Sequence, residues 1–220
     1  ITVATVVDSN FTQYRWLESH DSGNTWQTSN NYIPSQMLRE LELDPQRQGV
    51  IYVGTHDFGL IKSSDNGLTW EQITASISRS GSVLVLELDS LGNIYVSIMG
   101  MGLYYSTDGG SSWQHLTANY PGGSLYYDID MKNDNIIASG YMGGSLMLYA
   151  DEHWRRIDQG ISPDSGNFIT ARFDDISETI YAGTFNYTGS GGLFRTDDFG
   201  TGWEQINSPI DIVGILDMNN

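Results

Sequence analysis

Short apolar runs separated by turn residues recur along the chain in a fixed order, which is typical of antiparallel sheets. The clearest copy has an alternating run at 38–43, an apolar run at 50–55, a shorter one at 60–63 and a fourth at 70–73. The order returns at 83–88, 93–98, 103–106 and 113–116, at 125–129, 135–140, 146–149 and 154–157, and at 169–173, 179–184, 193–196 and 203–206. Each copy predicts one four-stranded sheet.

A short motif, Ser/Thr-x-Asp-x-Gly-x-x-Trp, stands between the third and fourth runs. It occurs as SHDSGNTW at 19–26, SSDNGLTW at 63–70, STDGGSSW at 106–113 and TDDFGTGW at 196–203. Trp154 falls where a degenerate copy should be, and the steps from Trp26 to Trp70, Trp113, Trp154 and Trp203 are 44, 43, 41 and 49 residues. A repeat of this length, built from short strands, predicts one small sheet copied around an axis.

This motif resembles the Asp box, or BNR repeat, of β-propellers. Sialidases, the sortilin ectodomain, xyloglucanases and a photosystem II assembly factor all carry it. The resemblance covers nearly the whole chain but singles out none of these families. Because they do unrelated things, the resemblance predicts the fold and leaves the function open.

The two ends of the chain complete the predicted architecture. Runs at 1–8, 14–19 and 26–29 supply three strands of a first sheet, and the run at 212–217 resembles an innermost strand. We therefore predict an all-β, five-bladed β-propeller of four-stranded antiparallel blades, with the ring closed by pairing of the N- and C-terminal strands. The predicted blades are residues 212–217 with 1–30, then 37–74, 82–117, 124–158 and 168–207, in a single domain of residues 1–220.

Every position of the Asp box has a structural explanation. The aspartate accepts hydrogen bonds from turn amides, the glycine takes a positive φ, and the tryptophan buries its ring between sheets. A turn with one carboxylate is a weak calcium site, so we expect no metal and no cofactor. The predicted structural residues are Asp21, Gly23, Trp26, Asp65, Gly67, Trp70, Asp108, Gly110, Trp113, Asp198, Gly200 and Trp203.

A ligand site is expected at the other end of the sheets, in the loops between second and third strands and in the connections between blades. Aromatic and methionine side chains there, with few charges, suit sugar rings or an apolar segment of a protein. An alternative is that several of these side chains only cap the core. The predicted ligand-binding residues are Phe11, His56, Asp57, Phe58, Tyr120, Tyr141 and Tyr187, with Met99 and Met101 at the same end.

A glycosidase needs two carboxylates about 5 to 10 Å apart across one bond. The best candidate pair is Asp57 and Asp8, in loops of adjacent predicted blades. Asp57 in GTHDFG also resembles the acidic loop of xyloglucanases, but the matching loops IMGMG and GYMGG contain no second acid. The arginine cluster of a sialidase is not recognisable either. The sequence therefore offers Asp57 and Asp8 as candidates and assigns no complete catalytic pair.

Charged residues recur on the predicted innermost strands. Aligning those strands places Glu42, Glu87, Asp128, Arg172 and Ile215 at one level. This predicts a partly paired, solvated ring of charges in a central channel, because isolated buried charges are costly.

Composition reduces the range of partners and sites that the chain could have. The 10 basic and 27 acidic residues give a net charge of −17, which repels nucleic acid and anionic membranes. No apolar run approaches the length of a membrane span, and the chain has no cysteine for disulfides or thiolate sites. We expect a secreted or periplasmic, non-catalytic module that binds a carbohydrate or a protein segment, as a monomer or as part of a larger assembly. A glycoside hydrolase and a scaffold or assembly factor are the alternatives.

Overall fold

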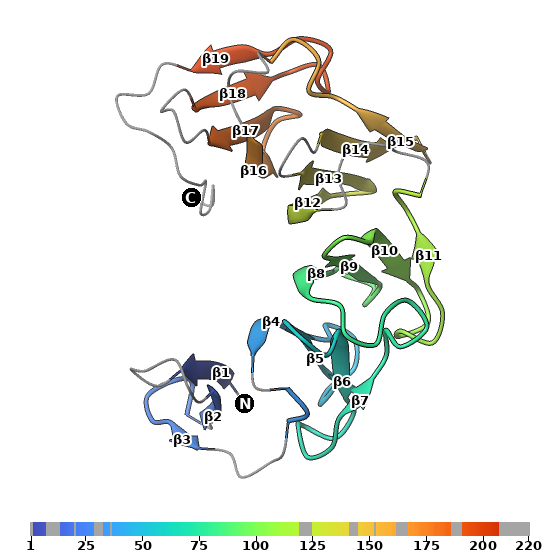
Figure 1. Cartoon of the computed structure of the whole chain (residues 1–220). Helices are drawn as coiled ribbons and strands as arrows, with labels where there is room; N and C mark the ends of the chain where they lie inside the picture. The colour runs from blue at the N-terminus through green and yellow to red at the C-terminus, as the bar shows by residue number, and fades with distance from the viewer. Residues whose placement is uncertain are drawn as a thin grey trace. The chain divides into compact units, whose positions relative to one another are not determined.

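The computed structural model describes residues 2–7, 14–19, 21–28, 33–35, 37–118, 125–140, 145–151, 153–161, 167–185 and 191–206. These residues form strands and turns (Figure 1). No helix that could cross a membrane occurs in this described part of the chain.

The strands form five antiparallel sheets, each with its strands in sequence order. The first contains β1 (Thr2–Val7), β2 (Tyr14–Ser19) and β3 (Gln27–Thr28). The second contains β4 (Leu38–Leu43), β5 (Ile51–Thr55), β6 (Leu60–Ser63) and β7 (Glu71–Gln72). The third contains β8 (Val83–Leu88), β9 (Ile94–Ile98), β10 (Gly102–Ser106) and β11 (Gln114–His115). The fourth contains β12 (Tyr126–Lys132), β13 (Asn135–Gly140), β14 (Leu146–Ala150) and β15 (His153–Arg156), and the fifth contains β16 (Asn167–Phe173), β17 (Ile180–Phe185), β18 (Gly192–Thr196) and β19 (Glu204–Ile206).

The five sheets confirm the all-β prediction and agree with the predicted number of blades. The strands expected at 14–19, 38–43, 60–63, 83–88 and 135–140 have these bounds in the structure. The first sheet has three described strands, as its sequence runs predict. Residues 212–217 lie outside the described residues, so closure of a ring remains a prediction.

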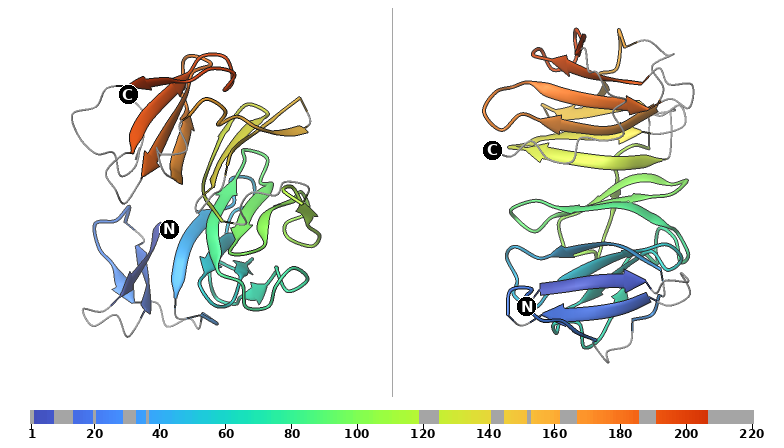
Figure 2. Two further views of the ribbon diagram at one scale, coloured as in Figure 1. Left: turned by 45° about the horizontal axis from the view of Figure 1, so that its top comes forward. Right: turned by 90° about the vertical axis from the view of Figure 1, so that its left-hand side faces the viewer.

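The chain divides into two compact units, Ile1–Ile94 with Ser106–Trp113, and Tyr95–Tyr105 with Gln114–Asn220. In the first unit β4 lies beside β8, and in the second β12 lies beside β16 (Figures 1 and 2). One core cluster of the first unit consists of Ile51, Val53 and Ile61. The cluster of the second unit consists of Ile137, Leu146, Leu148, Ile157, Phe168, Ala171, Phe173, Ile180 and Ala182.

The first strands of three sheets share a register shift near their start. Beyond this shift, one position of the first strand pairs with the same position of the second strand in all three sheets. The pairs are Glu42 with Tyr52, Asp130 with Ile137, and Arg172 with Tyr181. The sequence alignment that placed Asp128 at this level is therefore wrong by two residues. The error arises because β12 continues to Lys132, beyond the apolar run at 125–129 from which the strand is predicted.

Carboxylates on the first strands link neighbouring sheets within each unit. In the first unit, the Leu86 N–H donates a hydrogen bond to Glu40 Oε2. In the second, the Ala171 N–H donates to Asp128 Oδ2 at 3.1 Å. These side chains satisfy backbone amides at the edge of the next sheet, which would otherwise be costly to bury.

Candidate functional site

The turn His56–Gly59 between β5 and β6 is the best-described part of the predicted ligand end. Its backbone is closed by a hydrogen bond of 3.0 Å from the Thr55 N–H to the Gly59 carbonyl. The Thr55 hydroxyl donates to the same carbonyl at 2.8 Å and accepts from the Phe58 N–H at 2.9 Å. One threonine side chain thus holds both sides of the turn, which limits its freedom to move.

Gly59 is required where this turn meets the segment after β7. Its φ is +67°, and an added Cβ would lie less than 3.0 Å from the Thr74 hydroxyl. That hydroxyl accepts a hydrogen bond of 3.0 Å from the Leu60 N–H, and the Gly59 N–H donates to the Gly81 carbonyl at 3.0 Å. The turn is therefore anchored to the connection that leads into β8.

Asp57 is exposed, but the segment before β4 fixes its orientation. The hydroxyl of buried Ser35 donates a hydrogen bond of 2.5 Å to Asp57 Oδ1. Ser35 also accepts from the Met37 N–H at 3.2 Å, and the His56 N–H donates to the Met37 carbonyl at 2.8 Å. Sequence reasoning missed Ser35 because it lies 22 residues from Asp57 and belongs to no recognisable motif.

The two neighbours of Asp57 differ in exposure. His56 is half-buried at the surface of the turn. Phe58 packs against the core cluster of Ile51, Val53 and Ile61. The turn therefore presents an imidazole and a carboxylate to solvent, while its phenyl ring mainly closes the core. Such a pair can accept and donate hydrogen bonds to a polar ligand.

The equivalent turn of the third sheet, Met99–Gly102, follows the same plan. The Leu103 N–H donates to the Thr117 hydroxyl at 3.1 Å, as Leu60 does to Thr74. Met99 and Met101 are 47% and 40% exposed, so this turn offers two flexible apolar side chains to solvent. Exposed methionines adapt to varied apolar partners.

The remaining predicted ligand residues cannot be placed. Asp8, Phe11, Tyr120, Tyr141 and Tyr187 lie outside the described residues. The structure thus brings His56, Asp57 and Phe58 together, and the pairing of Asp57 with Asp8 stays a prediction.

The Asp boxes use their carboxylates inside the turn. Asp108 Oδ1 accepts hydrogen bonds of 2.8 Å from the Ser112 N–H and from the Ser106 hydroxyl. Its Oδ2 accepts from the Ser112 hydroxyl at 2.6 Å. These bonds, that of the Ser112 hydroxyl first, lower the pKa of Asp108 to about 2. Both oxygens of the box carboxylate are thereby engaged in holding the hairpin.

One expectation for the boxes is wrong. The sequence pattern predicts that each box tryptophan is buried between sheets, yet Trp70, Trp113 and Trp203 are only partly buried. Trp26 is 41% exposed, and its indole donates to the Gly23 carbonyl of its own box. Within the described residues, no sheet precedes the first one to cover this ring.

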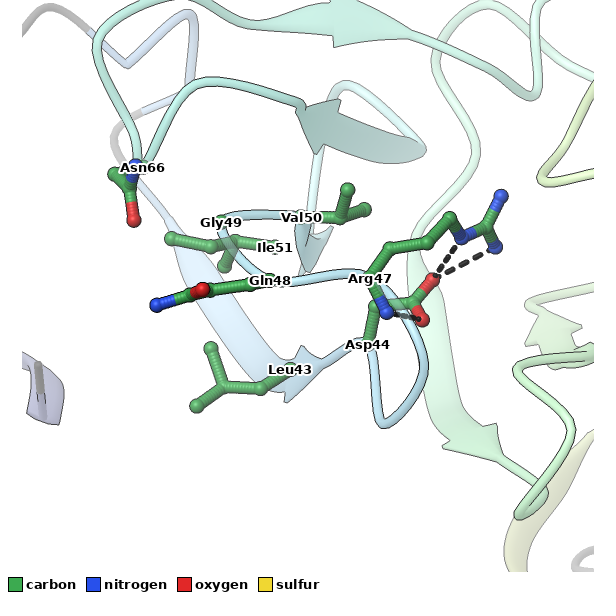
Figure 3. Close-up of a pocket in the computed structure, with 8 residues that line it drawn as sticks. All are labelled: Leu43, Asp44, Arg47, Gln48, Gly49, Val50, Ile51 and Asn66. Atoms are coloured by element: carbon green, nitrogen blue, oxygen red, sulfur yellow. Dashed lines mark hydrogen bonds and ion pairs between the residues drawn. The ribbon is translucent and has the colours of Figure 1, made fainter.

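A concavity lies at the turn between β4 and β5, at the end of the second sheet opposite the His56–Gly59 turn (Figure 3). Its volume is about 260 Å³, and Asp44 and Arg47 lie on one side of the turn, away from Leu43, Gln48 and Asn66. The Arg47 guanidinium forms an ion pair with Asp44 at 2.7 Å. Burial alone would raise the pKa of Asp44, but hydrogen bonds from Arg47 and the Gln46 backbone outweigh it and lower the pKa. This paired carboxylate stabilises the turn.

In the described part of the chain, no three histidine, aspartate or glutamate side chains gather in a way that could hold a metal ion. Residues 14–147 match the family described as Sortilin, neurotensin receptor 3 (Sortilin-Vps10). The chain belongs to the Sortilin-Vps10 family. This agrees with the Asp-box resemblance. No curated protein matches the chain.

Solved structures with similar folds carry different functions. The GH74 xyloglucanase from Xanthomonas campestris has a TM-score of 0.73 at 22% identity, over 94% of this chain and 36% of the enzyme. YCF48 bound to D1 peptide has a TM-score of 0.63 at 15% identity, over 93% and 64%. The extracellular domain of the two-component system BT4673 from B. thetaiotaomicron has 0.62 at 16%, over 83% and 23%.

The chain spans about a third of the length of the xyloglucanase. At these identities the likeness shows the fold alone. It confirms a β-propeller of the Asp-box type and leaves the function to the site itself.

Proposed function

We propose that this member of the Sortilin-Vps10 family is a non-catalytic module that binds a segment of another protein through the His56–Gly59 turn. The observation that supports this most is the bond from buried Ser35 to Asp57. It holds an exposed carboxylate in one orientation on a backbone that is fixed at both ends. A group arranged this way loses little conformational entropy when it binds a ligand.

Two comparisons favour a protein segment over a saccharide. The description of the family names a neurotensin receptor, and YCF48 was solved with a D1 peptide. The predicted aromatic residues Phe11, Tyr120, Tyr141 and Tyr187 belong to the same proposal, each as a separate contact to be tested. The module would work outside the cytoplasm, secreted or periplasmic, as the solved part of BT4673 is extracellular.

The test is selection from a random displayed peptide library, followed by affinity measurement with a synthetic copy of a selected peptide. Asp57→Asn and His56→Ala should each weaken binding about tenfold, the loss expected for one hydrogen bond to a charged group. Glu71→Gln, an exposed acid on β7 of the same sheet, is the matched control and should bind as the wild type does. Equal affinity in all four proteins would reject the turn as the site.

The same proteins should be applied to a glycan array. Binding of a saccharide that Asp57→Asn weakens, with no peptide selected, would replace the protein ligand by a carbohydrate. Loss of folding is monitored by circular dichroism, so that a collapsed variant is not counted as a binding defect.

A glycoside hydrolase is the second candidate, because the xyloglucanase has a TM-score of 0.73. In that case Asp57 would act with Asp8. Wild-type protein should then release reducing sugar from xyloglucan, and Asp57→Asn should lose turnover while still binding the polysaccharide. We expect no turnover by the wild type, since one carboxylate alone does not make a catalytic pair.

We also propose that the two units belong to one five-bladed propeller, in which residues 212–217 pair beside residues 1–8. The support is the sequence of residues 212–217, which resembles an innermost strand, and the three described strands of the first sheet. Deleting residues 210–220 should then lower the melting temperature sharply. An unchanged transition would exclude this closure.

A further inference from the structure

Two Asp boxes pack onto the preceding sheet of their own unit. The indole Nε1 of Trp113 donates a hydrogen bond of 2.9 Å to the main-chain oxygen of Ile73. The indole of Trp203 donates in the same way to Ile157, at 2.6 Å. The box glycine Gly110 also approaches Ile73 so closely that an added Cβ would lie under 3.0 Å from its side chain. At these two junctions, a box covers the residue that follows the last strand of the preceding sheet.

The fourth sheet departs from this plan. Strands β14 and β15 are joined by a tight turn that includes Asp151, whose φ is +52°, in place of an Asp box. Trp154 lies inside β15, and its ring centroid is 5.5 Å from that of Tyr149 on the adjacent strand. The hairpin is therefore too short to supply a loop like those that carry Trp113 and Trp203 onto the preceding sheet.

A cavity occupies the position that a box would cover. Leu116 ends the run WQHL, as Ile73 ends WEQI and Ile157 ends WRRI. Leu116 lines a surface cavity of about 110 Å³ in the second unit. The lining residues are Tyr95, Tyr105, Gln114, Leu116, Ile136 and Tyr149.

The lining suits a flat apolar group. The rings of Tyr95 and Tyr105 lie 4.7 Å apart between centroids at 33°, and no lining side chain is charged. In the second sheet the same two positions hold Tyr52 and Lys62, and the Lys62 ammonium donates to the Gly109 carbonyl of the next box at 3.1 Å. Lysine thus stands at this position where a box covers the sheet, and tyrosine stands there where the cavity is open.

We propose that this cavity binds an aromatic side chain, preferentially tryptophan, presented by a segment of a partner protein. The indole would occupy the place that Trp113 and Trp203 take at their own junctions. Engineered cavities of about 150 Å³ take up benzene, so this smaller surface cavity of about 110 Å³ would take one part of an indole ring and leave the rest at its mouth. Three tyrosine rings offer tilted or offset contacts to an aromatic guest. The site is independent of the His56–Gly59 turn, so either can fail without the other.

The test uses the full chain and N-acetyl-tryptophan amide as the probe. Methyl resonances of Leu116 and Ile136 are followed by NMR during the titration. They should shift saturably in the wild type, with N-acetyl-leucine amide binding at least about fivefold more weakly, the factor expected for aromatic stacking. Tyr105→Ala should weaken binding of the tryptophan probe by a similar factor.

Two further variants separate the cavity from a folding effect. Tyr104→Ala is the matched control, because Tyr104 is the neighbour on β10 and stacks on His115 at 4.4 Å instead of lining the cavity. It should bind the probe as the wild type does. Leu116→Trp should fill the cavity from within and abolish the shift of the Ile136 methyl.

Three results would overturn the proposal: no saturable shift in the wild type, equal binding of the leucine probe, or unchanged binding by Leu116→Trp. The wild-type titration decides the matter even if Tyr105→Ala does not fold.

Discussion

Thr69 donates two hydrogen bonds to Asp65, from its N–H at 2.8 Å and from its hydroxyl at 2.6 Å. The Ser63 hydroxyl adds a third at 2.8 Å. The pKa of Asp65 falls to about 2, mainly through the Thr69 hydroxyl, since hydrogen bonds to the charged form favour it. The same arrangement lowers the pKa of Asp21 and Asp108 to about 2.

This relationship predicts a pH dependence of stability. A carboxyl group with a folded pKa below its unfolded value of 3.8 stabilises the fold above that value. The contribution is lost as the pH falls through the folded pKa near 2. The melting temperature should therefore decline between about pH 4 and pH 2, and Asp65→Asn should reduce the slope in that window. An identical slope in the variant would show that the box carboxylate is not coupled to folding.

Substitutions of Trp113 and Trp26 should have contrasting effects on stability. Trp113 is partly buried and bonds to the preceding sheet, whereas Trp26 is 41% exposed and bonds within its own box. Trp113→Ala should cost about 2–4 kcal/mol and Trp26→Ala distinctly less, as measured by urea unfolding. Trp113→Phe, which keeps a ring and removes the donor, should cost about 1 kcal/mol. Equal losses at Trp113 and Trp26 would contradict the role given to the contact between sheets.

Gly59 and Gly100 form a second matched pair. Both have positive φ, at +67° and +76°, but only Gly59 faces a close neighbour, the Thr74 hydroxyl. Gly100→Ala should cost about 1–2 kcal/mol through backbone strain alone. Gly59→Ala adds a clash and should cost about 2–4 kcal/mol, and it should loosen the turn that carries Asp57. Chemical denaturation of the two variants measures the difference, which should vanish if the Thr74 contact is unimportant.

The sequence predicts most of the strands because burial is repetitive in this fold. All five residues of β5 and of β9 are buried, so these second strands stand out as apolar runs. The Asp boxes are equally easy to predict, because their hydrogen bonds join residues within one short turn. The register of the first strands was harder to predict. Asp130 and Lys132 continue β12 as a polar strand, and apolar periodicity gives no sign that it extends so far.

The candidate sites depend on contacts between residues far apart in the chain, which sequence patterns do not predict. Asp57 could be singled out from its loop, but the hydrogen bond from Ser35 joins segments separated by 22 residues. The cavity beside Leu116 arises from a missing box in the next sheet. The sequence shows that Trp154 belongs to a degenerate copy, but the space this leaves becomes visible only when the two sheets are packed.

Arg172 and Asp128 supply a final prediction about how the second unit is held together. Their side chains form an ion pair at 2.5 Å and are 25% and 14% exposed. Replacing only the cation, as in Arg172→Met, leaves a mostly buried carboxylate without its ion-pair partner and should cost about 1–3 kcal/mol. The Ala171 N–H still donates to Asp128 in that variant, which limits the loss. Combining Arg172→Met with Asp128→Asn should recover part of it, giving a coupling energy of about 1–2 kcal/mol in a double-mutant cycle. A coupling near zero would mean that water screens this pair as it screens surface ion pairs.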